Sequence, residues 1–283
     1  MTNQNDLRRH PARSLDGARD MAHKAVQLVT KAARANLTAE HDDSHSNLGW
    51  KGDLGAFVSQ PLPGNSGDLF VGLNISRLSL MIVSDGQAGP SLELAGVSDS
   101  DAGEWLDGQL AQSGLRAASP ASLPYDLPAS AAGIKVYATD GLGDALATLS
   151  AWFSFAEVQL ERFAASQAQL SPGPSPVRCW PHHFDIATYV GLEAGGAETN
   201  RGIGVGMSPG DESYGQPYFY INPWPHLDAD RLPGLLPPGH WHTQGFVGAI
   251  ATAEEVLSLD NIAEKMPAFV NDAFAIGREK LGV

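Results

Sequence analysis

The stretch 68-DLFVGLNISRLSLMIVSDG-86 decides the fold class of this chain. Apolar residues alternate with other residues in its first half, which is the period of a β-strand with one buried face. The second half continues the alternation, and Asp85-Gly86 then provides the residues of a tight hairpin turn. The segment 91-SLELAGV-97 is the expected partner strand, so the sequence predicts antiparallel sheet. The residues predicted to line one face are Leu69, Val71, Leu73, Ile75, Leu78, Leu80 and Ile82.

Helices are predicted on both sides of this strand block. Apolar residues recur every three or four positions over 16–37 and, most clearly, over 142–163. The pairs Ser98–Asp101 and Thr252–Glu255 have the spacing of helix-capping boxes, which predicts two further helix starts. Pro267 is expected to interrupt the last helix, because proline lacks the backbone donor that a helix interior needs.

A second block of strands is predicted in the C-terminal half. Its segments are 178–190, 202–208, 216–222 and 241–251, and a proline-rich loop precedes the last of them. A short strand is also predicted at 134-IKVYA-138, after a connection that shows no period.

The order helix, strands, helix occurs twice along the chain. Clustered strands with separate helices favour an α+β fold, with antiparallel β-sheets and helices packed on one face. The two halves are candidates for a structural duplication. We expect a flexible tail over residues 1–15 and a single domain over 16–283, divisible into sub-domains 16–133 and 134–283.

Composition narrows the classes of partner. The 283 residues carry a formal net charge of −14, and the only basic cluster is a short one near the N-terminus. This charge disfavours nucleic acid and anionic membranes as partners. No apolar run reaches the length of a membrane-spanning helix, and the polar N-terminus predicts a cytoplasmic protein. Cys179 is the one cysteine, so no internal disulfide can form.

The second strand block opens with 178-RCWPHHFDIATYV-190, which concentrates polar chemistry. In a continuous strand, Trp180 and His182 lie on one face, whereas His183 and Asp185 lie on the other. His183 and Asp185 then converge on one ligand. In the alternative interpretation, both histidines donate to carbonyl groups in a buried hairpin, and Asp185 pairs with an arginine.

A metal site is one hypothesis for these residues. His240 and His242 are two positions apart, and on a strand such a pair presents two imidazoles to one ion. A carboxylate as third ligand would leave a position open for water, as in catalytic zinc sites. We therefore predict a divalent metal such as zinc, held by His183, Asp185, His240 and His242. A metal-free polar pocket is the alternative.

The turn 208-SPGDES-213 carries two further candidates. Its Pro-Gly pair is typical of a β-turn, and a plain turn is the simplest interpretation. Asp211 and Glu212 also follow a predicted strand directly, where functional loops often begin. They are our candidate catalytic residues, with the role of activating a water molecule whose pKa a metal has lowered.

Aromatic residues gather in the same half. Packing in the core is their simplest role, and a ligand pocket with stacking surfaces is the alternative. The residues predicted to line this pocket are His182, Trp180, Tyr218, Tyr220, Trp224 and Trp241.

Four segments carry a resemblance. The stretches 179-CWPHHFDIAT-188, 205-VGMSPGDES-213, 216-QPYFYINPWP-225 and 240-HWHTQGFVGA-249 follow one another in the order seen in a bacterial family of domains of unknown function. That family resembles this chain over about residues 176–250, with a Trp-Pro-Glu-His-Phe-Asp strand, a Ser-Pro-Gly-Asp turn and a Pro-Tyr-Phe-Tyr strand. His182 stands where the family often has glutamate. The resemblance implies where a site lies, and it implies no activity.

Three functions fit these observations. The first is a divalent-metal-dependent, hydrolase-like enzyme with a polar and aromatic pocket in the C-terminal half. The second is a non-catalytic module that binds a small molecule through the aromatic residues. The third is a structural or interaction protein without an active site. The sequence indicates no substrate and no oligomeric state.

Overall fold

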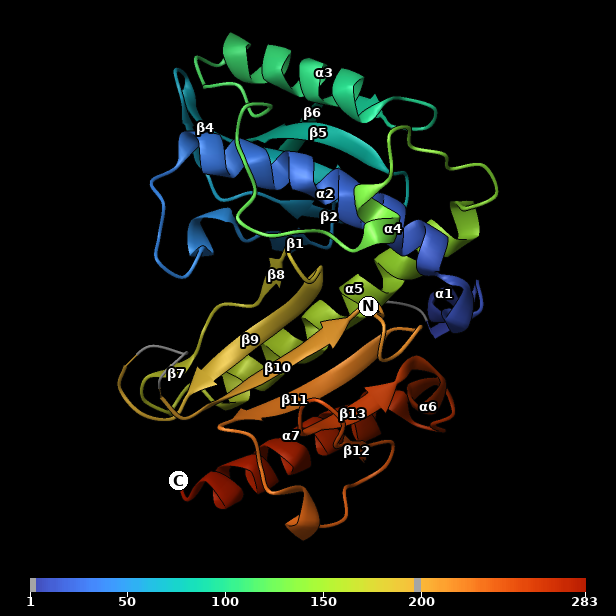
Figure 1. Ribbon diagram of the computed structural model, residues 1–283, viewed down its shortest axis with the longest axis vertical. Coiled ribbons are helices and arrows are strands. Elements are labelled where there is room, and N and C mark those ends of the chain that lie inside the picture. Colours follow the sequence, from blue (N-terminus) through green and yellow to red (C-terminus); the bar gives the residue numbers. More distant parts are fainter. Residues whose placement is uncertain (1–3, 196–199) are drawn as a thin grey trace. The chain divides into compact units, whose positions relative to one another are not determined.

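The computed structural model describes residues 4–195 and 200–283 and shows the predicted α+β architecture with two antiparallel sheets (Figure 1). The chain forms two compact units. The N-terminal unit extends to Ser154 and also contains Cys179–Phe184; the C-terminal unit contains Phe155–Arg178 and Asp185–Val283. The division falls within helix α5 (Gly143–Ser166), whereas the sequence suggested a boundary at 133/134.

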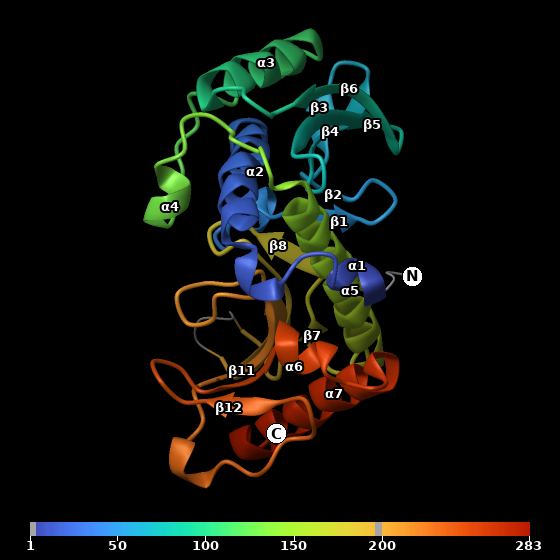
Figure 2. The ribbon, with the colours of Figure 1, turned by 90° about the vertical axis from the view of Figure 1, so that its right-hand side faces the viewer.

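The N-terminal unit is built on a sheet with the strand order β1-β2-β4-β5-β6, and β3 pairs with β4. Helix α2 contacts β4 and lies along one side of this sheet in Figure 2. The elements of this unit before α5 are α1 (Gln4–Leu7), η1 (Ala12–Ser14), α2 (Asp16–Asn36), η2 (Ser44–Ser46), β1 (Gly49–Lys51), β2 (Ala56–Val58), β3 (Leu62–Gly64), β4 (Gly67–Asn74), β5 (Ser79–Ser84), β6 (Gln87–Glu93), α3 (Asp99–Gln112) and α4 (Ala129–Ala132).

The predicted hairpin turn at Asp85-Gly86 is confirmed, and its partner strand β6 covers Gln87–Glu93, whereas the sequence predicted 91–97. Val71 pairs with Ile82 across β4 and β5, so the alternating apolar residues of both strands line one face. Asp85 and Gly86 have φ of 50° and 73°, the left-handed conformation that both central residues of a type I′ hairpin turn require. Strand β6 follows, mostly exposed at the edge of the sheet, with Pro90 beside an irregularity in its pairing to β5.

Of two local predictions in this unit, one is confirmed and one is wrong. The helix start at Ser98 is confirmed, because the Ser98 side chain accepts a hydrogen bond from the Asp101 backbone at 3.0 Å. The strand at 134–138 is wrong: Val136 forms only an isolated bridge with Ser98. In the expected N-terminal tail, the side chains of Leu7 and Leu15 are buried, each 1% exposed.

The C-terminal unit is built on a sheet with the strand order β12-β13-β11-β10-β9-β7. Its central strand β10 pairs with β9 on one side and β11 on the other, antiparallel in both cases. The elements after α5 are β7 (Gly173–Pro174), β8 (Arg178–Trp180), β9 (Asp185–Gly191), β10 (Gly202–Ser208), β11 (Tyr218–Trp224), η3 (Ala229–Arg231), β12 (His240–His242), β13 (Gly248–Thr252), α6 (Ala253–Leu257) and α7 (Ile262–Leu281).

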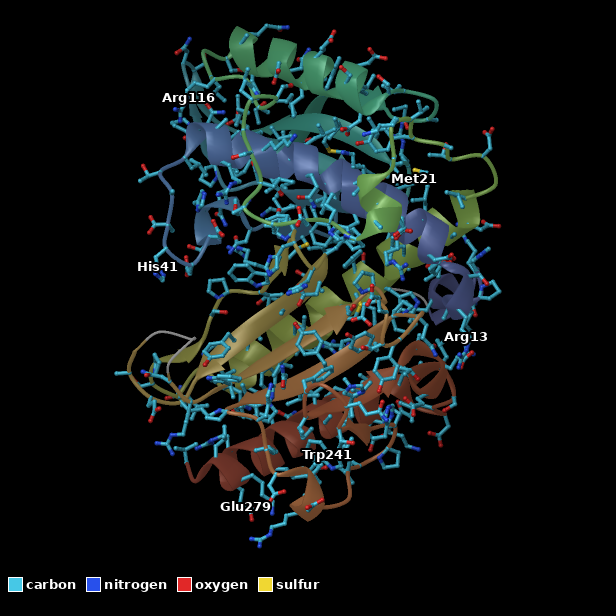
Figure 3. All side chains as sticks on the ribbon, in the orientation of Figure 1. Arg13, Met21, His41, Arg116, Trp241 and Glu279 are labelled. Atoms are coloured by element: carbon cyan, nitrogen blue, oxygen red, sulfur yellow. The ribbon has the colours of Figure 1, made fainter. Side chains whose placement is uncertain are left out.

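One face of the C-terminal sheet is apolar and covered by helices. Phe155 of α5 packs edge-to-face on Phe219 of β11, with ring centroids 5.7 Å apart. Helix α7 approaches the same face at Gly277, where a Cβ atom would stand only 2.9 Å from Ile203. Trp241, labelled in Figure 3, donates from its indole nitrogen to the Pro233 carbonyl at 2.7 Å.

The opposite face carries most of the polar chemistry, and we call it the polar face. Cross-strand partners share a face, and alternate residues along each strand do the same. The register therefore assigns to the polar face Asp185, Ala187, Tyr189, Gly202, Gly204, Gly206, Ser208, Tyr218, Tyr220, Asn222, Trp224, His240, His242, Gly248, Ile250 and Thr252.

Glycines on β10 make room for aromatic rings on the polar face. A Cβ atom at Gly202 would overlap the ring of Tyr189, and one at Gly206 would overlap the ring of Tyr220 and stand 2.8 Å from Ala187. At Gly204 the nearest atoms would lie 3.9 Å away. The glycine-rich segment of β10 thus serves close packing of tyrosines over the strand.

The C-terminal helices correct one prediction. Thr252 and Glu255 form the predicted capping box at the start of α6. The break in the last helix, however, lies at residues 258–261, and Pro267 sits within α7. Burial of Met266, Phe269 and other apolar residues of α7 offsets the hydrogen bond that the proline removes. Within the described residues, no helix has both the length and the apolar character to cross a membrane.

The glycines of β10 give a matched test of this packing. We expect Gly206→Ala to lower the free energy of unfolding by about 1–3 kcal/mol, because the added carbon meets Tyr220 and Ala187. Gly204→Ala should change it by less than about 1 kcal/mol, because that carbon meets only ordinary contacts. Urea denaturation of both variants measures the difference, and equal losses would contradict the packing described for β10.

Candidate functional site

The segment that opened the second strand block is not a continuous strand. Residues 181–184 form a turn between β8 and β9, closed by bonds from the backbone nitrogens of His183 and Phe184 to the Trp180 carbonyl at 3.2 and 2.8 Å. Phe184 has φ of 58°, a left-handed conformation rare for an aromatic residue. The prediction that His182 and His183 occupy alternating strand faces is therefore wrong.

The predicted metal ligands do not form a recognisable cluster. In the described ranges 4–195 and 200–283, no three His, Cys, Asp or Glu side chains are grouped so that they could hold a metal ion. His183 lies in the turn of the N-terminal unit, whereas Asp185, His240 and His242 belong to the C-terminal unit. The prediction of a zinc-type site thus finds no support in the arrangement of its residues.

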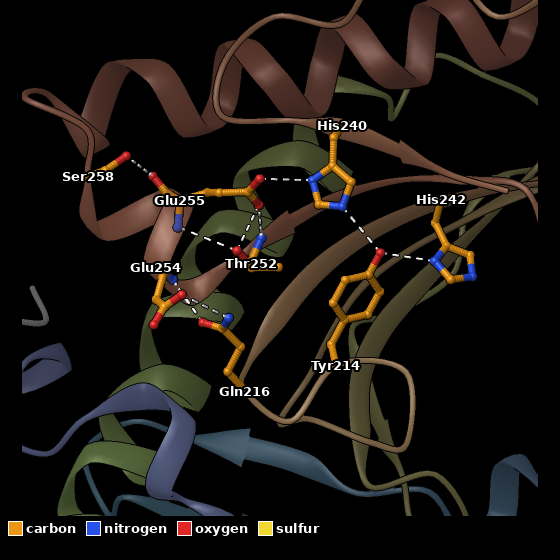
Figure 4. A network of polar contacts seen from close by, with 8 residues as sticks. All are labelled: Tyr214, Gln216, His240, His242, Thr252, Glu254, Glu255 and Ser258. Atoms are coloured by element: carbon orange, nitrogen blue, oxygen red, sulfur yellow. Dashed lines mark hydrogen bonds and ion pairs between the residues drawn. The ribbon is translucent and has the colours of Figure 1, made fainter. Parts of the chain in front are cut away.

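His240 and His242 do converge, but on a hydroxyl group. Tyr214 Oη lies 3.2 Å from His240 Nε2 and 2.9 Å from His242 Nδ1 (Figure 4). The two histidines reach this atom because they are alternate residues of β12, paired with Ile250 and Gly248 of β13. All three residues are partly exposed.

A carboxylate holds the far side of His240. Glu255 Oε1 lies 2.9 Å from His240 Nδ1, and Glu255 Oε2 accepts from the Thr252 hydroxyl at 2.7 Å and backbone nitrogen at 2.8 Å. Glu255, which forms the capping box of α6 with Thr252, therefore also orients the His240 imidazole. One carboxylate can make both sets of bonds because Thr252, the last residue of β13, lies next to β12 in the sheet. The side chains of His240 and Glu255 are 39% and 37% exposed.

His242 ends the chain of contacts at a carbonyl group. Its Nε2 atom lies 2.5 Å from the Gln244 backbone oxygen, and its ring stacks on Phe246 with centroids 4.3 Å apart. The network therefore runs from Glu255 through His240, Tyr214 and His242 to Gln244, with four polar contacts in series.

A proton count gives the charge that full hydrogen bonding of this series would require. The Glu255 carboxylate and the Gln244 carbonyl can only accept, so each of the four contacts needs one proton from a residue between them. Two neutral imidazoles and the Tyr214 hydroxyl supply three. All four contacts are hydrogen-bonded only when one of the two imidazoles carries a second proton, and the Glu255 carboxylate offsets that charge.

The position of the extra proton sets the direction of the Tyr214 hydroxyl. With the proton on His242, Tyr214 donates to His240; with the proton on His240, Tyr214 donates to His242. The two patterns interconvert when the Tyr214 proton moves to one imidazole and the other imidazole gives its proton to the tyrosine oxygen. The geometry thus allows a proton to pass between the two imidazoles through that oxygen.

Asp211 holds Tyr214 in place. Asp211 Oδ1 accepts from the backbone nitrogens of Ser213 and Tyr214 at 2.8 and 3.0 Å, and the Asp211 nitrogen donates to the Tyr214 carbonyl at 2.9 Å. These bonds close a loop over Asp211–Tyr214, directly after the Pro-Gly pair. Asp211, predicted to be catalytic, thus shapes the loop that presents the tyrosine. Glu212, the other predicted catalytic residue, is exposed in the same turn.

A row of tyrosines continues along the polar face. The ring centroids of Tyr214 and Tyr218 are 4.9 Å apart, and those of Tyr218 and Tyr220 are 6.3 Å apart. Tyr218 donates to Asp211, and Tyr220 donates to Asp185. Each of these hydroxyls therefore has an acceptor, as buried polar groups require.

Burial keeps these tyrosines protonated. Burial raises the pKa of Tyr218 well above the ordinary range, and its hydrogen bond to the Asp211 carboxylate adds to the shift. Burial also raises the pKa of Tyr214, helped by the negative charges of Glu255 and Asp211. At neutral pH both residues act as hydrogen-bond donors and do not form tyrosinate.

The aromatic residues predicted to form one pocket are divided between the units. Trp180 and His182 contact each other in the N-terminal unit, with centroids 6.1 Å apart. Tyr218 and Tyr220 belong to the C-terminal unit. Trp224, at the end of β11, is 42% exposed and meets His226 edge-to-face. Trp241, also in the C-terminal unit, bonds to the proline-rich loop.

Sequence reasoning did not predict the roles of Tyr214, at the centre of the network, and Glu255, at one end of it. Tyr214 lies in a loop without a periodic pattern, so no strand or helix rule gave it a direction. Glu255 was read only as a helix cap, although the same pattern also placed it next to the end of a strand. The spacing of His240 and His242 was the one signal that pointed to this site.

Comparison with known proteins adds no relative. No family model, curated protein or solved structure matches this chain. The resemblance to a bacterial family of unknown function therefore stays a prediction, and the site is argued from its own geometry.

The proton count is open to direct measurement. Side-chain nitrogen NMR of His240 and His242 at pH 7 counts these protons: we expect three N–H protons on the two rings, one more than two neutral imidazoles carry, because only that count fills all four contacts. Tyr214→Phe removes the shared atom, and the two rings should then respond to pH independently. His226, an exposed histidine outside the network, is the internal reference. Two fully neutral rings in the wild-type protein would contradict the count.

Proposed function

We propose that the C-terminal unit is an acid–base catalyst for a small polar molecule, with the Tyr214 hydroxyl as the group that exchanges a proton with it. The observation that carries this proposal is the convergence of His240 and His242 on one tyrosine oxygen, at 3.2 and 2.9 Å. A tyrosine hydroxyl donates one proton and accepts through its oxygen, so it can bond to both imidazoles at once. Because each imidazole can give or take a proton at the nitrogen that faces the oxygen, the arrangement supports proton exchange at this atom.

The roles of the residues follow from their contacts. Tyr214 gives its proton to the substrate, and the protonated imidazole on one side returns a proton to the tyrosine oxygen in the same step. This order avoids a free tyrosinate, which burial and the nearby carboxylates disfavour. Glu255 orients His240 and stabilises its cation, as a carboxylate behind a catalytic histidine does.

A metal-dependent reaction is less well supported by the same residues. The four residues predicted to hold zinc form no group suited to a metal, and Tyr214 occupies the point on which two of them converge. The proposal therefore keeps the polar site of the C-terminal half and replaces its metal-bound water by the tyrosine relay. It also keeps the small molecule as the partner.

Loss of the Tyr214 hydroxyl tests this function. Purified protein would be incubated in D₂O with small esters, amides and carbonyl compounds, and both product formation and deuterium uptake at carbon would be followed by proton NMR. We expect Tyr214→Phe to lower the wild-type rate by about 10²–10⁴-fold, the usual contribution of a positioned proton donor. Because Tyr214 is partly exposed, its variant should stay folded.

A second tyrosine provides the matched control. Tyr125→Phe also removes one hydroxyl, which donates to Gln27 in the N-terminal unit at 2.8 Å, and it should leave the rate unchanged. If the network only fastens β12 to the loop, the wild-type protein will show no turnover and Tyr214→Phe will lower the melting temperature alone. That result would refute an acid–base function.

A further inference from the structure

The turn at residues 181–184, which carries His182 and His183, lies outside the proposed site and makes several contacts with the N-terminal unit. We call residues Cys179–Phe184 the clasp, because the chain enters the N-terminal unit only for these residues after leaving it at Ser154. Cys179 exchanges two backbone hydrogen bonds with Leu48, at 2.8 and 3.0 Å. The clasp therefore adds a short antiparallel bridge to that unit.

Two buried side chains of α2 hold the middle of the clasp. The Pro181 carbonyl accepts from His23 Nε2 and from Gln27 Nε2, each at 2.9 Å. His23 is 4% exposed and Gln27 is 3% exposed. Gln27 is fixed in turn by Tyr125, whose hydroxyl donates to its Oε1 atom. The histidine that donates to the Pro181 carbonyl of the clasp is thus almost inaccessible to solvent.

The buried ring of Phe184 completes the attachment of the clasp to the N-terminal unit. Phe184 is fully buried, stacks on His23 with centroids 5.1 Å apart, and meets Phe153 edge-to-face at 5.2 Å. Its left-handed φ of 58° is strained for a residue with a Cβ atom. Burial of the ring offsets this strain, so the conformation persists only while the clasp is docked.

We propose that the clasp is a pH-sensitive switch, in which protonation of His23 and His182 releases Cys179–Phe184 from the N-terminal unit. His23 is buried and bonds the Pro181 carbonyl, and the half-buried ring of His182 lies against exposed His183 with centroids 4.2 Å apart. A charge on His23 would stand in a place with little water, and a charge on His182 would stand near the other imidazoles. The docked clasp therefore favours neutral rings at His23 and His182.

The surrounding charges do not compensate for protonation. His23 faces Asp20 and Arg19 of its own helix and His183 of the clasp, so one carboxylate is set against two groups that oppose its effect. His182 faces His183, His23 and Asp43, but Asp43 is already paired with Arg34 at 2.7 Å. Tyr125, the other titratable neighbour, stays neutral because burial raises its pKa.

The direction of the switch follows from these surroundings. Burial lowers the pKa of His23 to about 4, and burial together with the neighbouring His183 lowers that of His182 to about 4. A released histidine has a pKa near 6.5. The released state therefore binds more protons between about pH 6.5 and 4, and docking weakens as the pH falls through that window. At pH 5, His23 alone raises the opening constant roughly 20-fold over its value at pH 7.

Release of the clasp is expected to affect the polar face, because the two are neighbours along the chain. Asp185 follows Phe184 directly and accepts the hydrogen bond of Tyr220. Release of Phe184 removes the fixed end that precedes Asp185. Acid is thus expected to loosen the first residue of β9 without any change at Tyr214, so the switch does not depend on the acid–base function proposed above.

Hydrogen exchange of the full chain tests the switch. The amide of Cys179 reports docking, because it donates to Leu48, and the amide of Val205 in β10 is the reference. After correction for the intrinsic effect of pH on exchange, we expect the opening constant at Cys179 to rise by at least about 20-fold from pH 7 to pH 5, the contribution of His23 alone, with no comparable rise at Val205.

Variants of one buried histidine identify the cause. His23→Phe keeps a ring against Phe184, and His23→Gln keeps an amide that can donate to Pro181; neither can be protonated. Both should remove the contribution of His23 and so reduce the rise at low pH, leaving the part that His182 supplies, and the two replacements guard against a variant that fails to fold. His41→Gln, which removes an exposed histidine of the same unit (labelled in Figure 3), should keep the wild-type response. An unchanged opening constant in the wild-type protein, or an undiminished rise in both His23 variants, would overturn the proposal.

Discussion

The pairing of β10 between β9 and β11 is the constraint on which the C-terminal unit depends. This register places the glycines and the tyrosines on one face, and the apolar residues that meet α5 and α7 on the other. A shift by one residue would exchange the two faces along the whole strand. The glycines protect against such a shift, because only they leave room for the rings of Tyr189 and Tyr220.

Sequence patterns predicted the elements well where one periodicity extends over many residues. The hairpins after residue 68, the helix over 142–163 and strand β10 follow directly from alternating or helical apolar spacing. The failures share a cause: a short segment whose conformation is decided by distant contacts. Residues 181–184 carry strand-forming residues on both sides, yet burial of Phe184 in the N-terminal unit draws them into a turn.

The candidate site was predicted only in part for a related reason. The period of a strand showed that His240 and His242 act together, but it could not name the atom between them. That atom comes from Tyr214, a loop residue positioned by side-chain bonds of Asp211. Loop geometry of this kind depends on hydrogen bonds between particular atoms, which no periodic pattern encodes. Two of the residues predicted to bind metal, His240 and His242, thus belong to the candidate site, and the function of that site stays a proposal.

The edge strand β6 has a consequence for how the protein behaves in a crowded solution. An exposed strand edge offers unpaired backbone groups to other chains and is a common starting point for aggregation. Here the edge is interrupted near Pro90, which has no backbone donor, and it ends at Glu93, which pairs with Arg77. Neighbouring molecules thus find no long, regular edge to extend, which favours colloidal stability of the N-terminal unit.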